Sequence, residues 1–262
     1  MASASDSPTQ RFSDRVPEYI RYRPSYPAGV IEHLRLHAGL GSGAVVADLG
    51  SGTGLFSRLL LATGAQVFAV EPNDAMRAAA ERDLADQPGF TSVAGTAEEK
   101  GLQDQSIALV TAAQAFHWFE GPACRRECQR LLRPSGQVAL VWNERQSNTT
   151  AFLAGYEALL LRYATDYARI NHRNIAGAKL AAFYGPAGYT TTEFPSEQRF
   201  DLPGLQGRLM SSSYAPKTGH PSHEPMFAEL AELFVRHAEG GQIAFRYTTK
   251  LYLGALESEA RS

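Results

Sequence analysis

The sequence predicts an α/β protein with a Rossmann-like, doubly wound sheet. Between residues 44 and 143, short apolar runs alternate with amphipathic stretches, a spacing that indicates βαβ units and a parallel sheet. Later, residues 243–253 alternate between apolar and polar side chains, which is typical of a half-buried antiparallel strand. We therefore expect a largely parallel sheet that a late antiparallel strand completes.

The expected elements follow one another in a regular order. Parallel strands are expected over five segments: residues 44–49, 66–70, 90–94, 107–113 and 136–142. Helices are expected over residues 27–37, 54–63, 122–132, 151–163 and 226–237, and over a segment that Asn73 caps. The stretch 166–225 is polar and interrupted by Gly and Pro, and Pro195 limits any strand there to the edge of the sheet.

Composition excludes several classes of protein. The chain has 262 residues, of which 44% are hydrophobic and 20% charged, so it can bury a core of one large domain or of a domain with a cap. The net charge is −2, and this lack of basic excess argues against nucleic-acid partners and anionic membranes. Two cysteines and no apolar run of membrane-spanning length favour a cytoplasmic protein.

The most informative motif is a glycine-rich turn at the end of the first strand. It reads Asp48-Leu49-Gly50-Ser51-Gly52-Thr53-Gly54, and its glycines permit a sharp turn and a close approach to a ligand. Free N–H groups at the following helix favour a polar or anionic ligand group. A dinucleotide fingerprint needs its third glycine one position later, where this chain has Leu55. Asp48 suits a ligand that carries an ammonium or sulfonium group.

An acidic residue, Glu71, ends the second strand. A carboxylate there can accept hydrogen bonds from both hydroxyls of a ribose, although a solvated acid at a strand end is the simpler alternative. Together with the glycine turn, Glu71 indicates a nucleoside ligand.

These motifs resemble those of the class I S-adenosylmethionine-dependent methyltransferases. Residues 22–27 and 114–119 are similar to the type 11 small-molecule branch, which includes the trans-aconitate methyltransferases. The resemblance implies S-adenosylmethionine as cofactor and a seven-stranded sheet whose last strand is antiparallel. It also implies a division into a flexible tail (1–18), a cofactor-binding core with an N-terminal lid (19–143), a helical cap that binds substrate (144–225), and a C-terminal helix and strand that complete the sheet (226–262).

The resemblance assigns roles to individual residues. The glycine turn packs on the amino-acid part of the cofactor, Glu71 holds the ribose, and the segments after the second and third strands lie beside the adenine. Thr96 replaces an acid that the family often has, which leaves a contact with the adenine amino group open. The expected cofactor-binding residues are Asp48, Gly50, Ser51, Gly52, Gly54, Glu71, Pro72, Met76, Thr96, Ala97 and Gln114.

Catalytic and substrate-binding residues are expected beyond the fourth strand, in the lid and in the cap. Gln114 and His117 are the catalytic candidates, because ligands bind at the carboxyl ends of strands and an imidazole accepts a proton near neutral pH. His117 is expected either to act as a base or only to orient its neighbours. The expected substrate-binding residues are Tyr22, Arg23, Tyr26, Trp118, Arg208 and Tyr214. No metal site is expected, since His220 and His223 lack a third ligand nearby in the sequence.

The sequence thus predicts methyl transfer by in-line displacement to a small-molecule nucleophile, with a carboxylate or another polar metabolite as substrate. Two alternatives stay open: a nicotinamide-dependent oxidoreductase with a Rossmann domain, and a nucleoside-binding module without catalytic activity. The sequence leaves the oligomeric state and the methylated atom (O, N or C) undetermined.

Overall fold

The computed structural model describes residues 16–99, 101–165, 167 and 177–256. Most of the expected N-terminal tail, residues 1–15, lies outside the described residues. In the described part, the strands β1 to β5 follow one another in the expected order, with a helix after each of them except between β3 and β4, which no helix separates.

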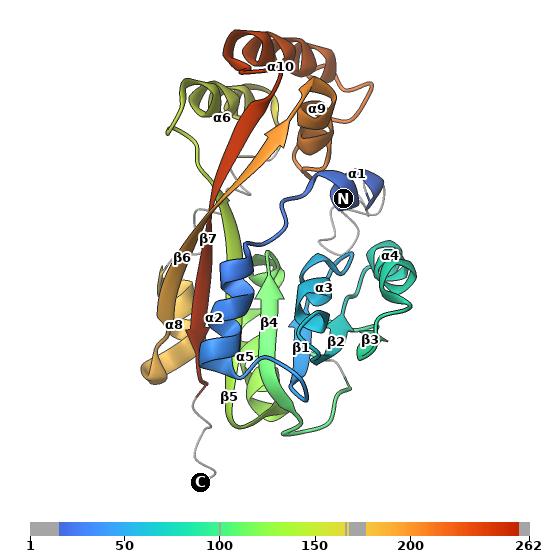
Figure 1. Cartoon of the computed structure of the whole chain (residues 1–262), viewed down its shortest axis with the longest axis vertical. Helices are drawn as coiled ribbons and strands as arrows, with labels where there is room; N and C mark the ends of the chain where they lie inside the picture. Colours follow the sequence, from blue (N-terminus) through green and yellow to red (C-terminus); the bar gives the residue numbers. More distant parts are fainter. Residues whose placement is uncertain (1–15, 100, 166, 168–176, 257–262) are drawn as a thin grey trace, which may run out of the picture.

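The centre of the fold is a seven-stranded sheet of order β3-β2-β1-β4-β5-β7-β6 (Figure 1). Strands β3, β2, β1, β4 and β5 are parallel, whereas β7 runs antiparallel to both β5 and β6. The predicted fold class and the antiparallel last strand are therefore confirmed, and β6, which contains Pro195, forms the edge of the sheet. The strands are β1 (Val45–Leu49), β2 (Gln66–Val70), β3 (Phe90–Val93), β4 (Ile107–Ala113), β5 (Leu132–Arg145), β6 (Thr190–Phe200) and β7 (Ile243–Gly254).

Helices cover both faces of the sheet because successive strand residues point to opposite sides and both sides are apolar. In β5, Val138 and Leu140 pack in one cluster with α5 and α8, whereas Ala139 and Val141 pack in another with α2 and α3. The helices around the sheet are α2 (Ala28–Ala38), α3 (Leu55–Leu61), α4 (Asp74–Leu84), α5 (Gly121–Leu131) and α8 (Gly177–Tyr184), with short 3-10 turns at η2 (Phe116–Trp118) and η4 (Gly185–Ala187).

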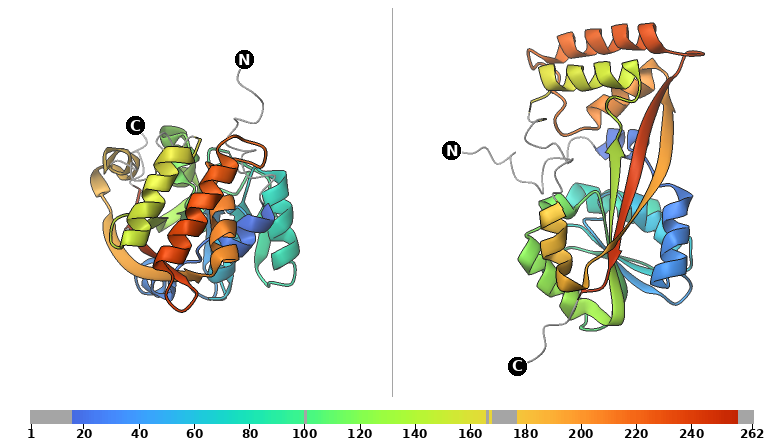
Figure 2. Two further views of the ribbon diagram at one scale, coloured as in Figure 1. Left: turned by 90° about the horizontal axis from the view of Figure 1, so that it is seen from above. Right: turned by 90° about the vertical axis from the view of Figure 1, so that its left-hand side faces the viewer.

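A separate helical layer caps one end of the molecule (Figure 2). Strands β5, β6 and β7, of 14, 11 and 12 residues, are longer than the other four and extend from the sheet to this cap. The far ends of β6 and β7 share an apolar cluster with the cap helices, in which Phe245 and Tyr247 of β7 are fully buried. The cap helices are α6 (Ala151–Tyr163), α9 (Leu202–Met210) and α10 (His223–His237).

Two elements that lie close together in the chain, β6 and α10, belong to different parts of the fold. Helix α10, which begins at His223, packs with α6 and α9 in the cap, whereas β6, which precedes it, pairs with β7 in the sheet. The cap is thus assembled from segments on both sides of the edge strand. None of the helices in the described part of the chain combines the length and hydropathy needed to cross a lipid bilayer.

The N-terminal segment connects the sheet domain to the cap. Helix α1 (Val16–Tyr22) contacts α4 through Val16, which packs on Met76 and Ala79. At its other end, Tyr22 packs against Gly207 of α9 and joins the apolar cluster of the cap. Helix α1 therefore bridges the two parts of the molecule (Figure 2).

Candidate active site

A cavity of about 270 Å³ lies at the carboxyl ends of the parallel strands, between the sheet and the cap. Its walls come from the segments after β1, β2, β3 and β4, from the end of β5, from the cap and from the stretch after α1. Many of the residues predicted from the sequence line it together: Arg23, Gly50, Gly52, Glu71, Pro72, Met76, Thr96, Ala97, Gln114, His117, Trp118, Arg208 and Tyr214. Ligands of open α/β sheets bind at this edge, so the cavity is the candidate active site.

The glycine turn forms one wall, but its N–H groups are already engaged. The N–H groups of Gly50 and Ser51 both donate to the Val70 carbonyl at 2.9 and 3.1 Å, and that of Gly54 donates to the Ser51 carbonyl at 3.0 Å. The N–H groups of Gly50, Ser51 and Gly54 are therefore engaged inside the protein. The expectation of free donors concerned the start of the following helix, α3, and stays a prediction.

Among the three glycines of the turn, Gly52 is the one that leaves room for a ligand. A Cβ at Gly50 would lie 2.6 Å from the Ala115 Cβ, and one at Gly54 would lie 2.7 Å from Leu84, so these two glycines permit close packing inside the protein. A Cβ at Gly52 would meet nothing within 4 Å and would enter the cavity. The backbone at Gly52 can thus lie directly against a bound molecule.

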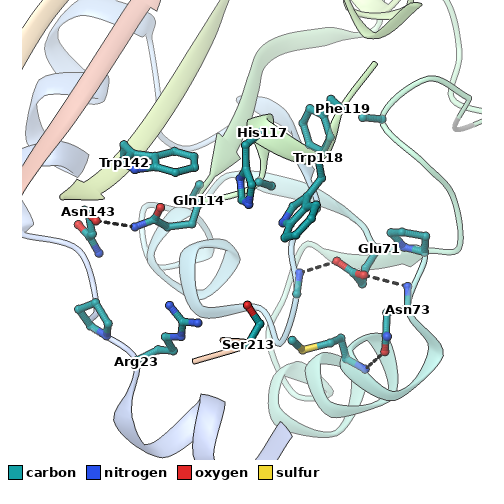
Figure 3. Close-up of a pocket in the computed structure, with 18 of the residues that line it drawn as sticks. Arg23, Glu71, Asn73, Gln114, His117, Trp118, Phe119, Trp142, Asn143 and Ser213 are labelled. Carbon is teal, nitrogen blue, oxygen red and sulfur yellow. Dashed lines mark hydrogen bonds between the residues drawn. The ribbon is translucent and has the colours of Figure 1, made fainter. Parts of the chain in front are cut away.

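The carboxylate of Glu71 is held in place beside Gly52. One oxygen accepts the Gly52 N–H at 2.9 Å and the other accepts the Asn73 N–H at 2.8 Å (Figure 3). Burial raises the pKa of Glu71, and these two hydrogen bonds oppose the rise. A carboxylate offers about four acceptor positions, so two remain for ligand hydroxyls. Asn73 in turn caps α4, accepting the Met76 N–H at 2.9 Å.

Asp48 does not line the cavity. It lies within β1, where the parallel pairing with β2 and β4 leaves it 1% exposed. Its carboxyl group accepts hydrogen bonds from the hydroxyls of Ser57, at 2.6 Å, and Thr111, at 2.8 Å. Asp48 is therefore not placed to contact a ligand in the cavity directly. Burial raises its pKa to about 6, against the two hydroxyl hydrogen bonds, which lower it.

Because of this raised pKa, the folded state binds the Asp48 proton more tightly than the unfolded state does. Its stabilising contribution is complete below pH 3.8 and is lost as the pH rises through about 6. We expect the unfolding free energy of the wild type to fall by about 3 kcal/mol relative to Asp48→Asn between about pH 4 and pH 7. Urea unfolding of both proteins across this range measures the difference, and a difference that does not change with pH would contradict it.

The opposite wall of the cavity is aromatic and polar. Gln114 follows β4 with a φ of 58°, its N–H donating to the Val141 carbonyl and its side-chain amide to the Asn143 carbonyl, both at 2.9 Å. The His117 ring lies 4.2 Å from the Trp118 ring and 5.1 Å from the Trp142 ring, measured between centroids. Figure 3 shows these side chains above Arg23 and facing the side of the cavity that holds Glu71.

Four further residues predicted for the site also lie outside the cavity. The Tyr22 ring packs in the cap, and the Tyr26 ring packs edge-on against Phe56 at 4.8 Å, under the sheet rather than in the cavity. Ser51 and Gly54 face the protein interior or the start of α3 and do not line the cavity. The tyrosines beside Arg23 indicated a binding cluster. In the structure, the ring of Tyr22 packs in the core of the cap and that of Tyr26 in a core of the sheet domain.

The structure adds lining residues that the sequence analysis missed. Trp142 and Asn143 lie near the carboxyl end of β5. Ligands bind at the carboxyl ends of parallel strands, so the reasoning that selected Gln114 and His117 after β4 would also have selected these two residues. Arg145, Tyr167 and Tyr247 reach the cavity from the extended strands and the cap, and no sequence motif marked them. Among the described residues, no group of three or more His, Cys, Asp or Glu is arranged to bind a metal ion.

Comparisons with known proteins agree with this architecture. Residues 47–140 match a family model described as a methyltransferase domain. An uncharacterised methyltransferase-like protein of Schizosaccharomyces pombe is 28% identical over 85% of both chains. An uncharacterised methyltransferase of Mycobacterium bovis is 40% identical over 51% of this chain and 52% of its own length. In fold, the chain resembles a protein assigned as a type II methyltransferase from Anaeromyxobacter dehalogenans, with a TM-score of 0.66 and 22% identity over 89% of this chain and 97% of that one.

The family model covers the strands that carry the glycine turn, Glu71 and the segment after β4, which are the parts of the chain that form the cavity floor. The oxidoreductase alternative finds no support in these comparisons. Sheet order, cavity position and sequence relatives agree with a class I S-adenosylmethionine-dependent methyltransferase, and residues 47–140 match its methyltransferase domain.

Proposed function

We propose that the cavity binds S-adenosylmethionine against Gly52 and Glu71 and that the protein methylates a small polar molecule held under the cap. The observation that carries the proposal is the Glu71 carboxylate, which backbone hydrogen bonds orient beside the open face of Gly52. This pair offers a ribose diol two acceptor positions and offers the adjoining part of a nucleoside an unobstructed backbone surface. Pro72, Met76 and Ala97 line the neighbouring wall, which suits an adenine ring.

The reaction requires little of the protein beyond alignment of the nucleophile with the methyl group. When bound, S-adenosylmethionine supplies a methyl group on a positively charged sulfur, which is already a strong electrophile. Residues that hold the nucleophile in line can supply about 7–11 kcal/mol by orientation alone. Gln114 is fixed by its hydrogen bond to Asn143 and can orient the acceptor, and His117 can take the proton of a protonated nucleophile.

A small acceptor fits this cavity better than a polymer does. The cap, α1 and the sheet enclose the site from several sides, and the net charge of −2 offers no basic surface for a nucleic acid. The side of the cavity near the cap carries arginine and tyrosine side chains, which suit a polar substrate. We therefore propose a small-molecule substrate and no nucleic-acid partner.

Calorimetric titration with S-adenosylhomocysteine, the reaction product, and with NAD tests this function. We expect S-adenosylhomocysteine to bind at one site per chain and NAD to bind at least about 100-fold more weakly, because the glycine turn places Leu55 where a dinucleotide site needs glycine. Equal affinity for both ligands, or no binding of S-adenosylhomocysteine, would contradict the proposal.

A further inference from the structure

Arg208 of α9 is a buried cation that has no anionic partner among the residues that the structure describes. It is 6% exposed, and it lines the cavity. Its Nε donates to the Tyr247 hydroxyl at 3.1 Å, and its Nη1 donates to the hydroxyls of Ser212, at 3.0 Å, and Ser211, at 3.3 Å. Within the described part of the chain, no carboxylate forms an ion pair with Arg208, and its Nη2 makes no hydrogen bond. Three hydroxyl groups thus orient the guanidinium without neutralising it.

A second arginine at the same end of the cavity shows the contrast. Arg145 forms an ion pair with Glu157 and a hydrogen bond with the Tyr167 hydroxyl at 3.0 Å. The Tyr167 hydroxyl also donates to Glu157 at 2.8 Å. The negative charge of Glu157 is therefore already matched by Arg145 and is not available to Arg208.

An unmatched buried charge is costly, and arginine cannot relieve the cost by losing its proton. A ligand that brings one negative charge into the cavity would neutralise it. A carboxylate matches the planar guanidinium, and Nη2 offers it donors that no described residue uses. One uncompensated positive charge favours a carboxylate over a phosphate group, which carries more negative charge at neutral pH.

The opposite end of the cavity is not available to such a ligand. Glu71 lies there, beside Gly52, and would repel an anion. Glu71 thus lies at the carboxyl end of β2, whereas Arg208 lies under the cap, where Arg23 also lines the cavity and donates to the Ser211 carbonyl at 3.1 Å. The arrangement separates a place for a nucleoside from a place for an anionic acceptor.

We propose that the methyl acceptor is a small organic carboxylate and that Arg208 binds its carboxylate group, with Tyr247 and Ser212 holding the guanidinium in position. The inference rests on the proposed function, since it assigns the acceptor of that same site. The aromatic wall of Trp142, His117 and Trp118 then contacts the uncharged part of the acceptor.

The test uses the full chain saturated with S-adenosylhomocysteine. Acetate, succinate and benzoate are titrated by calorimetry and thermal-shift measurement, with acetamide, succinamide and benzamide as uncharged isosteres and inorganic phosphate as a second anion, all at constant ionic strength. We expect the carboxylates to bind and raise the melting temperature, and the amides to have no effect. Arg208→Gln should weaken carboxylate binding by about 30-fold or more while S-adenosylhomocysteine still binds, and Arg208→Lys should retain part of the affinity.

Arg199→Gln is the matched control, because Arg199 lies on the edge strand β6, is exposed and pairs with Glu197 at 2.9 Å. It should bind carboxylates as the wild type does. The inference is overturned if no carboxylate binds the loaded wild type, if amides bind as well as acids, if phosphate binds as tightly as the best carboxylate, or if Arg208→Gln binds carboxylates normally. The wild-type comparison of acids with amides stays decisive even if Arg208→Gln does not fold. Failure of S-adenosylhomocysteine to bind would instead overturn the proposed function.

Discussion

Replacing Glu71 by alanine is expected to weaken S-adenosylhomocysteine binding by about 100-fold or more. Two hydrogen bonds from ribose hydroxyls to a carboxylate would be lost, and each hydrogen bond to a charged group contributes about 1.5–3 kcal/mol. The same change removes the acceptor of the Gly52 and Asn73 N–H groups, so the glycine turn also loses a contact that positions it. Calorimetric titration of the purified variant measures the affinity.

Glu71→Gln separates the two contributions. Its amide oxygen can still accept one of the two backbone N–H groups, but its NH₂ group faces the other donor. We expect an affinity between those of the wild type and Glu71→Ala. Glu81→Gln is the control, because Glu81 lies on the neighbouring helix α4, accepts the Ser92 hydroxyl at 2.6 Å and does not line the cavity. Wild-type affinity in a folded Glu71→Ala would remove the main support for the proposed cofactor site.

The sheet could be predicted from the sequence because its signals are local. Strands β1, β2 and β4 are short apolar runs that lie largely buried between two helical layers, and the helices that follow β1 and β2 have apolar residues at helical spacing. The late strand shows period-two alternation over residues 243–253, since one side of its far end packs in the cap and the other is partly exposed. These patterns do not depend on which distant segments they meet.

The cap could be predicted only in outline. Helix α9 has nine residues with Pro203, Gly204 and Gly207 inside it, so its composition predicts a loop. The structure shows why it is helical: Asp201 caps it by accepting the Gly204 N–H at 2.8 Å, and Tyr22 of the distant α1 packs on Gly207. Such contacts join residues far apart in the chain, and no local pattern reveals them.

The residues of the candidate site could likewise be predicted only in part. The residues that follow strand ends, such as Glu71, Gln114 and His117, were predicted because the fold itself brings strand ends together. Asp48 was assigned to the ligand because its charge was judged without knowing that Ser57 and Thr111 would surround it. Arg145 was missed because it reaches the cavity only through the extension of β5 into the cap.

The second large effect is expected at His117. If this residue removes a proton from the methyl acceptor, His117→Ala should lower kcat by about 100-fold or more, with KM changed only a few-fold, because general-base catalysis contributes about 10²–10⁴-fold. The ring lies between the indoles of Trp118 and Trp142, which fix its plane at the wall of the cavity. Rates of S-adenosylhomocysteine formation test the expectation when the methylated atom of the acceptor carries a proton, as in a hydroxy acid bound through its carboxylate, because an ionised carboxylate nucleophile needs no base.

Three readouts distinguish a base from a residue that only orients its neighbours. Loss of a base removes the part of the pH profile in which activity falls on acidification, and added imidazole restores part of the rate by entering the space left by the side chain. An orienting residue would instead raise KM, and His117→Asn, which keeps a planar polar group, would restore activity without imidazole. Normal turnover of His117→Ala at saturating acceptor would exclude the base. Catalysis would then depend on alignment of the acceptor by Gln114, whose strained backbone and hydrogen bond to Asn143 give it a fixed orientation.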